Sequence, residues 1–284
     1  MAESYKRILT IQDISCVGQC SLTVALPVIS ACGVECAVLP SAVLSTHTGG
    51  FKGFTFRDLT DDMPLIEKHW NSEGIKFDAI YTGYLGSVRQ IGIVKGIAAS
   101  TAAEGAPIIV DPAMADNGKL YYGFDDEFVK TMRTLIAGAD YVLPNITEAS
   151  FLTGIEYRET YDEAYVSSQI KALRDLGAKN VIMTGIGYRE GFTGVTVCEN
   201  GETRYYEHIK LPKGCHGTGD IYASAFVGAL MRGLSAYDSA VTAADFVLKC
   251  IEVTQDYPDH WYGARFESSL PSLISAIASG GAGK

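Results

Sequence analysis

The run Lys213-Gly214-Cys215-His216-Gly217-Thr218-Gly219-Asp220 is followed at once by the small-residue pattern Ile221-Tyr222-Ala223-Ser224-Ala225-Phe226. Glycine allows backbone conformations in which successive N–H groups face one point, and the N-terminus of a helix adds partial positive charge there. The run therefore predicts an anion site, most simply one for phosphate. Asp220 would only repel a phosphate that was merely bound. A carboxylate here instead suits a general base that takes a proton from an attacking hydroxyl while the glycine loop holds the developing charge.

Composition places the chain among acidic globular proteins. It has 284 residues, a formal net charge of −10 and 47% hydrophobic residues. We expect a single domain over residues 1–284, with a frayed tail from about residue 279, because no linker or internal repeat interrupts the pattern. The negative charge argues against nucleic acid as a partner, since phosphate backbones need a basic face. No apolar run approaches the ~20 residues of a membrane span, so we expect no membrane partner.

The seven cysteines favour a reducing compartment. Their number is odd, and no secretory signal opens the chain. Cys16 and Cys20, like Cys32 and Cys36, lie four apart, which is helix spacing rather than the tighter spacing typical of metal sites. We therefore expect reduced thiols in a soluble, cytoplasmic protein.

Short apolar runs alternate with segments of helical spacing. We expect strands at residues 7–12, 34–39, 77–82, 107–110, 140–143 and 180–183, and helices at 22–32, 88–104, 163–176, 220–232, 236–255 and 266–278. Strands that are apolar almost throughout and separated by helices indicate a parallel sheet covered on both faces, a doubly wound α/β fold. Residues 194–199 and 202–208 alternate around Asn200-Gly201, which predicts a late antiparallel hairpin.

Polar residues and glycines follow the predicted strands. In an open α/β sheet, ligands bind beyond the carboxyl ends of the strands, so these residues and the glycine loop are expected to form one site. Taken alone, each has a structural interpretation: Asn145 and Glu148 match a helix capping box, and His47 and His216 match hydrogen-bonded structural histidines. Neither common nucleotide-binding glycine fingerprint is present. The strand-end residues are Asp13, 45–50, 83–86, 111–116, 144–148 and 184–187.

Gly217-Thr218-Gly219-Asp220, Asn145-x-x-Glu148 and Asp111-Pro112 together resemble the ribokinase-like superfamily. Ile11-Gln12-Asp13 with Gly18, and Ser45-Thr46-His47-Thr48-Gly49, are similar to its vitamin B6 branch, the pyridoxal/pyridoxine/pyridoxamine kinases. The runs 83–87 and Trp261-Tyr262-Gly263 resemble the bacterial pyridoxamine-kinase type. The similarity extends from about residue 6 to about residue 277. It implies a ribokinase-like three-layer αβα sandwich with a mostly parallel central sheet.

The resemblance implies ATP-dependent phosphorylation of the hydroxymethyl group of a B6 vitamer. Asp220 would be the general base, and the N–H groups of Gly217, Thr218 and Gly219 would form the anion hole. The resemblance further implies a homodimer, and it leaves open whether a monovalent cation assists. The remaining implied residues are Glu148 and Asp116 for Mg²⁺, Asp111, Asn145, Thr184 and Gly185 for ATP, and Asp13, Thr48 and Tyr84 for the pyridoxal pocket.

Two departures keep other functions open. Asp13 stands where many pyridoxal kinases have a serine that touches the ring, so a carboxylate here favours a cationic substrate. Cys215-His216 resembles the hydroxymethylpyrimidine kinase branch, which is the nearest alternative. A sugar kinase is less favoured, since no small lid is evident near the N-terminus. A non-catalytic ligand sensor would tolerate loss of Asp220 or Glu148, and a nicotinamide-dependent dehydrogenase would need a glycine fingerprint after the first strand.

Overall fold

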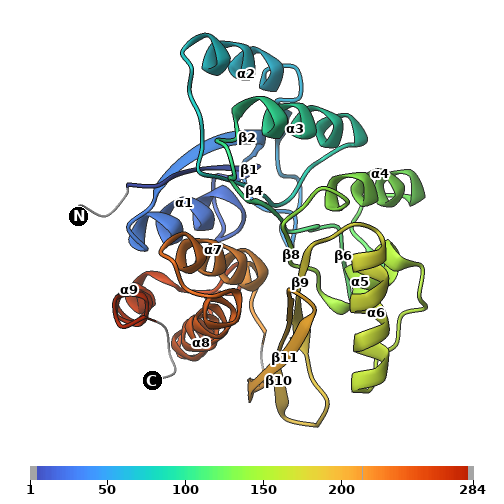
Figure 1. Cartoon of the computed structure of the whole chain (residues 1–284). Coiled ribbons are helices and arrows are strands. Elements are labelled where there is room, and N and C mark those ends of the chain that lie inside the picture. Colours follow the sequence, from blue (N-terminus) through green and yellow to red (C-terminus); the bar gives the residue numbers. More distant parts are fainter. Residues whose placement is uncertain (1–4, 213, 281–284) are drawn as a thin grey trace.

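A mostly parallel sheet runs through the middle of the computed structural model, which describes residues 5–212 and 214–280 (Figure 1). Within these residues the strand order is β11-β10-β9-β8-β5-β4-β1-β2-β3. The parallel strands are β1 (Arg7–Ser15), β2 (Glu35–Leu44), β4 (Ala79–Thr82), β5 (Ile108–Val110), β8 (Tyr141–Val142) and β9 (Asn180–Ile186). The antiparallel strands are β3 (Phe56–Asp58) at one edge and β10 (Phe192–Glu199) with β11 (Glu202–Ile209) at the other.

Helices cover both faces of this sheet (Figure 1). One layer contains α1 (Leu22–Ala31), α7 (Thr218–Met231), α8 (Ala236–Gln255) and α9 (Leu270–Ala278), the last preceded by the short turn η1 (Glu267–Ser269). The other layer contains α2 (Met63–Ser72), α3 (Val88–Thr101), α4 (Asp126–Ile136), α5 (Ile146–Thr153) and α6 (Glu163–Asp175). The expected three-layer αβα sandwich of the ribokinase-like type is confirmed.

Two apolar cores hold the layers together, one on each face of the sheet. Successive residues of β1 alternate between them: Ile8 belongs to the core beneath α1 and α7, and Leu9 to the core beneath α3 and α4. In β4, Tyr81 and Ile80 divide in the same way, and all four side chains are fully buried. Burial on both faces explains why the strand sequences are apolar throughout rather than alternating.

The predicted strands and helices are found, with differences at their ends that have local causes. The strand predicted at residues 34–39 continues to Leu44, because β2 keeps pairing with β1 beyond Pro40. The strand predicted at 180–183 continues to Ile186, which places Thr184 and Gly185 inside β9. The helix predicted from Asp220 begins at Thr218, and the helix predicted at 88–104 ends at Thr101. Of the predicted frayed tail, residues 281–284 lie outside the described residues.

The sequence pattern predicts neither α2 nor α4, nor the small hairpin of β6 (Ala115–Asp116) and β7 (Lys119–Leu120). In α2, Met63, Ile66 and Trp70 are apolar at helical spacing; Met63 is buried, and the other two are partly buried against the same core. α4 buries Phe128, Met132 and Leu135, also at helical spacing, so the prediction missed a periodicity that both helices carry.

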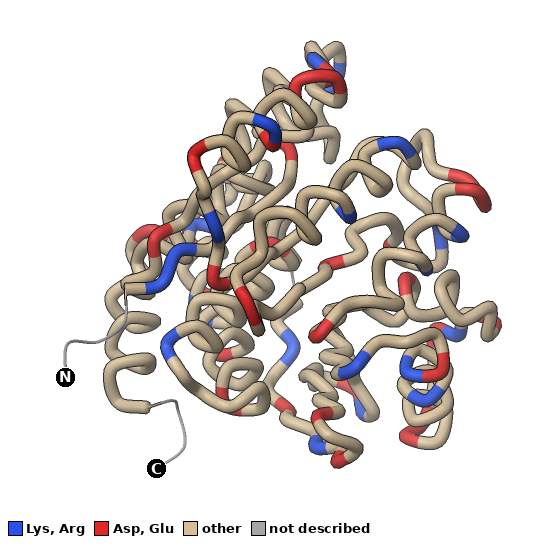
Figure 2. Tube along the Cα trace, turned by 45° about the horizontal axis from the view of Figure 1, so that its top comes forward, with Lys and Arg blue, Asp and Glu red and all other residues tan. Residues whose placement is uncertain are grey.

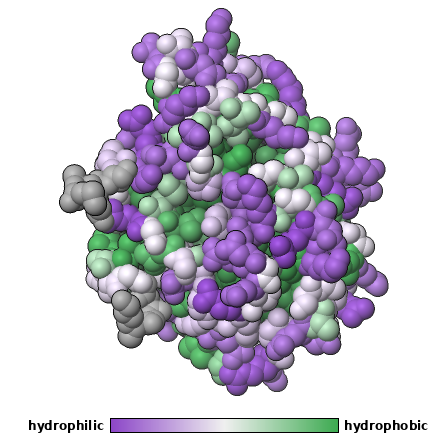
Figure 3. Space-filling view, in the orientation of Figure 1, coloured by the Kyte–Doolittle hydropathy of each residue, from purple (hydrophilic) through white to green (hydrophobic). Residues whose placement is uncertain are grey.

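Charges of both signs are spread over the surface. Lys and Arg are interspersed with Asp and Glu along α2, α4, α6 and α8 (Figure 2), and hydrophilic residues cover much of the face shown in Figure 3. In residues 5–212 and 214–280, no helix combines the length and hydrophobicity that a membrane span requires.

The close pairing of β10 with β11 depends on Gly194. A Cβ at this position would overlap the carbonyl oxygen of Tyr206. Gly194→Ala is therefore expected to lower the free energy of unfolding by about 1–3 kcal/mol, the usual cost of overpacking. Gly92, on the exposed side of α3, has open space beyond its Cα, so Gly92→Ala should instead raise stability by about 1 kcal/mol. Urea unfolding at neutral pH measures both, and equal effects of the two substitutions would contradict this packing argument.

Candidate active site

The glycine run forms the N-terminus of α7. Gly217 is the N-cap residue, with φ 75° and ψ 3°, a left-handed conformation that glycine adopts at little cost. The first intrahelical bond there is donated by the Ile221 N–H to the Gly217 carbonyl oxygen, at 2.9 Å. The first N–H groups of a helix have no intrahelical acceptor, so those of Thr218 and Gly219 can serve an anion. Of the two glycines that flank Thr218, Gly217 alone has positive φ; Gly219 lies inside the first turn.

Asp220 lies in this first turn of α7. Burial raises the pKa of its carboxyl to about 7; the negative charge of Asp13 raises it further, and a hydrogen bond from the Ser21 backbone N–H opposes the rise. The residue is surrounded by protein, yet it keeps partial solvent exposure. A carboxyl group with a pKa near neutrality, open to a small molecule, can accept a proton from it.

Asp111 and Glu148 lie near Asp220. Asp111 follows β5, and burial raises its pKa well above the usual value, with the charges of Glu148 and Asp220 adding to the rise. Glu148 is 3% exposed, and burial raises its pKa to about 7 against hydrogen bonds from the backbone of Asn145 and Met114. Asp116, an exposed residue of β6, adds to the rise at Glu148. The carboxyl ends of the strands therefore bring together acidic groups whose charges are not neutralised.

Asn145 caps α5 and fixes Glu148. Its Oδ1 accepts the N–H groups of Thr147, at 2.8 Å, and Glu148, at 2.9 Å, and the Glu148 Oε2 accepts the Asn145 N–H at 2.9 Å. The capping box expected from the sequence is thus confirmed. The Asn145 Nδ2 donates to the Ala115 carbonyl oxygen at 2.9 Å, and the Met114 N–H donates to Glu148 Oε1 at 3.2 Å. These bonds tie α5 to the segment that follows β5.

Thr184 and Gly185 lie beside Asn145 at the end of β9. The Thr184 N–H donates to the Pro144 carbonyl oxygen at 3.0 Å, and Thr184 forms a parallel bridge with Asn145. Gly185 has φ 69° and bulges out of the pairing between β9 and β10. It is exposed, and space is open where a side chain would stand. This part of the edge can accept a ligand that approaches the backbone closely.

Asp13, in β1, lies near Asp220, and Tyr84, after β4, lies near Asp13. Asp13 is 4% exposed; burial raises its pKa, and hydrogen bonds from Ser21 and Ser15 oppose the rise. The Ser15 hydroxyl donates to Asp13 Oδ2 at 3.1 Å. Burial, with the charge of Asp13, raises the pKa of Tyr84 to about 12. Thr48 is exposed on the loop after β2.

Four aromatic rings form a wall next to Asp13, which we call the aromatic wall: His47, Phe51, His216 and Trp261. The ring centroid of His47 is 5.0 Å from that of Phe51 and 5.3 Å from that of His216. The ring centroids of Phe51 and Trp261 are 4.7 Å apart. His47 Nδ1 accepts the Gly49 N–H at 3.0 Å, so its Nε2–H donates to the Tyr262 carbonyl oxygen at 2.6 Å. The structural interpretation of His47 is therefore confirmed, and burial lowers the pKa of His216.

The acidic groups do not form a metal cage by themselves. Among the described residues, no three His, Cys, Asp or Glu side chains converge to hold a metal ion. Mg²⁺ usually takes one or two carboxylates and completes its octahedron with water and substrate phosphate. Asp111 and Glu148 fit that mode. Burial raises the pKa of each carboxyl, and no cation is among the groups that shift either pKa.

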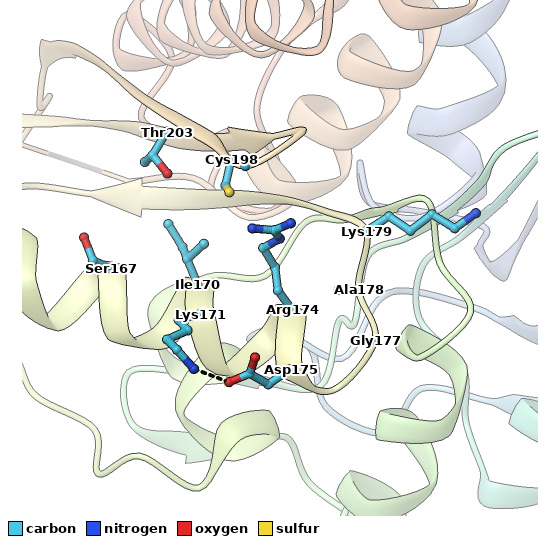
Figure 4. Close-up of a pocket in the computed structure, with 11 residues that line it drawn as sticks. Ser167, Ile170, Lys171, Arg174, Asp175, Gly177, Ala178, Lys179, Cys198 and Thr203 are labelled. Atoms are coloured by element: carbon cyan, nitrogen blue, oxygen red, sulfur yellow. Dashed lines mark hydrogen bonds and ion pairs between the residues drawn. The ribbon is translucent and has the colours of Figure 1, made fainter.

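A cavity of about 540 Å³ lies away from these residues, between α6 and the β10–β11 hairpin (Figure 4). It opens where the chain enters β9, at the opposite end of the strand from Thr184. Lys171 on its rim is paired with Asp175 at 2.6 Å, and Lys179 with Asp140 at 2.7 Å. Both lysines are paired, and Asp111, Glu148 and Asp220 lie elsewhere, so this cavity is a poor candidate for the functional site.

The structure brings most of the predicted residues to one edge of the sheet, and it adds residues that the sequence did not suggest. Tyr121, after β7, has its pKa raised by burial and by the charges of Glu148, Asp116, Asp111 and Asp220, so it borders the acidic group. Tyr81 is fully buried below Asp111 and Asp220, whose charges raise its pKa further. Ser21 lowers the pKa of both Asp13 and Asp220 through hydrogen bonding. A tyrosine or serine outside any motif carries no signal that sequence alone can separate from packing.

The sequence profile of the phosphomethylpyrimidine kinase family matches residues 25–263, most of the chain. The chain belongs to this family. Among its curated relatives is the pyridoxal kinase of Dictyostelium discoideum, 28% identical over 245 residues, which cover 80% of this chain and 78% of the relative. Another is the hydroxymethylpyrimidine/phosphomethylpyrimidine kinase of Bacillus subtilis, 28% identical over 222 residues, which cover 75% and 77%.

Solved structures of the family agree with the fold. The pyridoxal kinase of Lactobacillus plantarum matches with a TM-score of 0.88 at 32% identity, over 96% of this chain and 98% of that one. A Bacteroides thetaiotaomicron protein described as a phosphomethylpyrimidine kinase, in a crystal form with pyridoxal, matches with a TM-score of 0.89 at 38% identity, over 95% and 96%. Pyridoxal, pyridoxine and hydroxymethylpyrimidine kinases are thus among the relatives of this chain, and ATP is the co-substrate that a kinase implies.

The raised pKa of Asp220 predicts a pH-dependent stability. A carboxyl whose pKa is higher in the folded protein than in the unfolded chain stabilises the fold fully below about pH 4, and this contribution is lost as pH rises through about 7. Asp220→Asn removes the titration. Its stability relative to the unsubstituted protein should therefore rise between pH 4 and pH 8, by on the order of 2–4 kcal/mol.

Urea unfolding at the two pH values measures this difference, with Asp259→Asn, at an exposed position, as the matched control. A difference that stays constant between pH 4 and pH 8 would show that Asp220 is not held in an environment that disfavours its charge.

Proposed function

We propose that this protein is a vitamin B6 kinase, which transfers the γ-phosphoryl group of ATP to the hydroxymethyl group of pyridoxal, pyridoxamine or pyridoxine. The observation that carries the proposal is the position of Asp220. Its carboxyl, with a pKa near 7, lies in the first turn of α7 between two regions. Asp13, near His47 of the aromatic wall, belongs to β1, and Asp111, near Glu148, follows β5; these strands lie on either side of β4 in the sheet.

The reaction follows from this arrangement. Asp220 takes the proton of the substrate hydroxyl as its oxygen attacks the γ-phosphorus; the new P–O bond forms while the bond to the ADP oxygen breaks. The N–H groups of Gly217, Thr218 and Gly219 bind the equatorial oxygens of the transferred group, where charge develops. Positioning and charge stabilisation supply most of the catalysis in such transfers, so a preformed helix N-terminus suits the task.

ATP is assigned to the opposite side of Asp220. Asn145, Thr184 and Gly185 line the end of β8 and β9, where the exposed glycine leaves room for the nucleotide. Glu148 and Asp116, with Asp111, would hold Mg²⁺ through one or two carboxylates and bridging waters. When bound, this ion offsets the charge of the phosphates. Its positive charge would also relieve the repulsion among the acidic groups.

The ring is assigned to the side of Asp13, Thr48 and Tyr84. Aromatic rings of the wall give it an apolar face, and Asp13 gives it a carboxylate held by two serine hydroxyls. A buried carboxylate beside a bound ring favours a substrate that carries a positive charge, such as the amine of pyridoxamine.

Hydroxymethylpyrimidine kinase is the second candidate. Cys215-His216 in the glycine loop resembles that branch, and its members are relatives of this chain. Both reactions use the same acid–base chemistry on a hydroxymethyl group of an aromatic ring. Tyr84 and the run 45–49 favour a B6 vitamer, and a substrate comparison separates the two.

Purified protein with ATP and Mg²⁺ should phosphorylate at least one of pyridoxal, pyridoxine and pyridoxamine faster than hydroxymethylpyrimidine. Asp220→Asn should lower kcat by ~10²–10⁴-fold, the usual loss on removal of a general base, while ATP still binds. ADP release and phosphorylated product measure turnover, and calorimetry measures ATP affinity. Near-normal turnover by the variant would remove Asp220 from the mechanism, and a preference for hydroxymethylpyrimidine would favour the second candidate.

Asp13→Ser tests the role of the carboxylate in substrate choice. Removing a negative charge next to the ring should lower kcat/KM for pyridoxamine more than for pyridoxal, by about tenfold in the ratio, the scale of one charge-assisted hydrogen bond. Asp259→Asn removes an exposed carboxylate and should leave the ratio unchanged. If Asp13→Ser also leaves it unchanged, the carboxylate does not select for the amine.

A further inference from the structure

We propose that Gln90 is a positioning residue that connects the two segments of the ring side of the site. One segment is the hairpin of β2 and β3, whose loop carries Thr48 and two rings of the aromatic wall, His47 and Phe51. The other segment is the turn after β4, which carries Tyr84. This role rests on the proposed function, which assigns the substrate ring to this side.

The side-chain amide of Gln90 is fully buried in the first turn of α3. Its Nε2 donates to the Ser41 carbonyl oxygen at 3.0 Å and to the Thr60 hydroxyl oxygen at 2.9 Å, and its Oε1 accepts the Gly86 N–H at 2.7 Å. These partners fix the orientation of the amide, because a carbonyl oxygen can only accept and an N–H can only donate. Gln90 therefore joins three separate segments of the chain.

Two of these bonds hold the end of the hairpin that lies opposite its loop. Ser41 comes directly before the β2 residues that pair with β3, and its carbonyl oxygen also accepts the Leu59 N–H at 3.1 Å. Thr60 follows β3; its N–H donates to Asp58 Oδ1 at 2.6 Å, and its hydroxyl donates to the same oxygen. Because the hydroxyl hydrogen is used on Asp58, the Thr60 oxygen is left to accept from Gln90.

The third bond holds the turn that carries Tyr84. Gly86, which donates to Gln90, stands two residues after Tyr84. The Tyr84 carbonyl oxygen accepts the Ser41 hydroxyl at 3.5 Å, and Leu85 between them is fully buried in the core beneath α3. The backbone of Tyr84 is thus held through Ser41 and Gly86, and both of these residues are bonded to Gln90.

The start of α3 does not by itself require these bonds. Ser87 caps the helix, and its hydroxyl oxygen accepts the Gln90 N–H at 3.2 Å. In a capping box, the side chain at this position returns to the backbone N–H of the cap residue. The Gln90 side chain instead reaches Ser41 and Thr60, which lie 30 or more positions earlier in the chain. This glutamine therefore connects distant segments in addition to beginning its own helix.

The spacing of the two segments determines the fit of a ring between them. In the sheet β1 lies between β2 and β4, so the hairpin and the turn after β4 are not neighbours in the strand order. The Gln90 amide adds a connection from α3 to both. A shift of one segment against the other would move Thr48 relative to Tyr84. ATP is assigned to the ends of β8 and β9, beyond β5 in the strand order, so the same shift would leave its site in place.

Gln90→Met keeps the approximate size of the side chain and removes all three hydrogen bonds. In the variant, kcat/KM for the B6 vitamer that the unsubstituted protein uses best should fall by about 10- to 100-fold, the scale of a displacement of ~1 Å. Most of the loss should lie in KM, because Gln90 touches neither Asp220 nor the glycine loop. Kd for ATP should stay within about twofold. Steady-state turnover measures KM and kcat, and calorimetry measures Kd.

Gln169 in α6 offers a matched control. It is also fully buried; its Nε2 donates to Ser150 Oγ at 3.1 Å and to the Tyr165 hydroxyl oxygen at 2.9 Å. Its Oε1 accepts the Thr153 hydroxyl at 2.6 Å. Gln169→Met thus breaks two donated bonds and one accepted bond, as Gln90→Met does, but between α5 and α6. It should lower the thermal midpoint to a similar extent and leave KM for the vitamer within about twofold.

Thr60→Val guards against a Gln90 variant that fails to fold, because it keeps the approximate shape of the side chain and removes only the hydroxyl. It should raise KM for the vitamer by about three- to tenfold, the scale of one buried hydrogen bond. In the double variant with Gln90→Met, the rise in KM should be smaller than the product of the two single effects, because both substitutions break one connection.

An unchanged KM for the vitamer in Gln90→Met and Thr60→Val would overturn the positioning role. A rise of similar size in Gln169→Met, or a parallel rise in Kd for ATP, would also overturn it, since either would show a general loosening of the fold. Failure of the proposed function has a different signature. The unsubstituted protein would then prefer hydroxymethylpyrimidine, and the same variants are compared on that ring; a protein that phosphorylates neither ring rejects both proposals.

Discussion

Electrostatic repulsion at one edge of the sheet is the constraint on which the site depends. Asp13, Asp111, Glu148 and Asp220 follow or adjoin the carboxyl ends of the parallel strands, and burial raises the pKa of each. Hydrogen bonds from backbone N–H groups and serine hydroxyls, and the charge of His47 near Asp13, lower these pKa values. The fold holds the carboxyl groups in place because the rigid sheet and the starts of α5 and α7 fix their backbones. A cation bound at this edge would offset the repulsion among them.

The N-termini of α5 and α7 both lie at this edge of the sheet, but they serve it in different ways. α5 begins with a capping box, in which the side chains of Asn145 and Glu148 each accept the backbone N–H of the other residue. The first N–H groups of α5 are therefore bonded within the protein. α7 begins at Gly217 without any side-chain cap, so its N-terminus is free for an anion. The same helical geometry thus produces a structural support at one strand end and a binding element at another. The difference is set by a single residue, asparagine or glycine, at the N-cap.

Much of this could be read from the sequence, because strand order and strand ends follow simple rules. Parallel strands buried on both faces give unbroken apolar runs, and their carboxyl ends must lie at one edge, which placed Asp13, Asp111, Asn145 and Thr184 together. Gly217 and Asp220 could be predicted as site residues because the glycine run stands directly before a helical pattern, where backbone N–H groups can bind an anion. Ser21 could not be predicted from the sequence. Its positive φ of 53° and its place beside Asp13 and Asp220 depend on the packing of residues 19–21 against the loop that contains Gly217, almost two hundred positions later. The pairing of β3 at the edge is likewise decided by tertiary contacts.

The aromatic wall has a consequence for how such a site can change through evolution. At Gly18 a side chain would overlap the His47 ring, at Gly49 it would lie 2.9 Å from His216, and at Gly50 it would lie 2.8 Å from Trp261. Each of these glycines is therefore tied to one bulky partner on a distant segment. At Gly49 a larger residue is tolerated only with a smaller one in place of His216, whereas Gly18 (φ 110°) and Gly50 (φ 86°) would be strained by any side chain. Among natural relatives positions 49 and 216 should accordingly vary together while Gly18 and Gly50 stay glycine, and the specificity for the substrate ring should change through Thr48 and Phe51, which are free of that coupling to glycine.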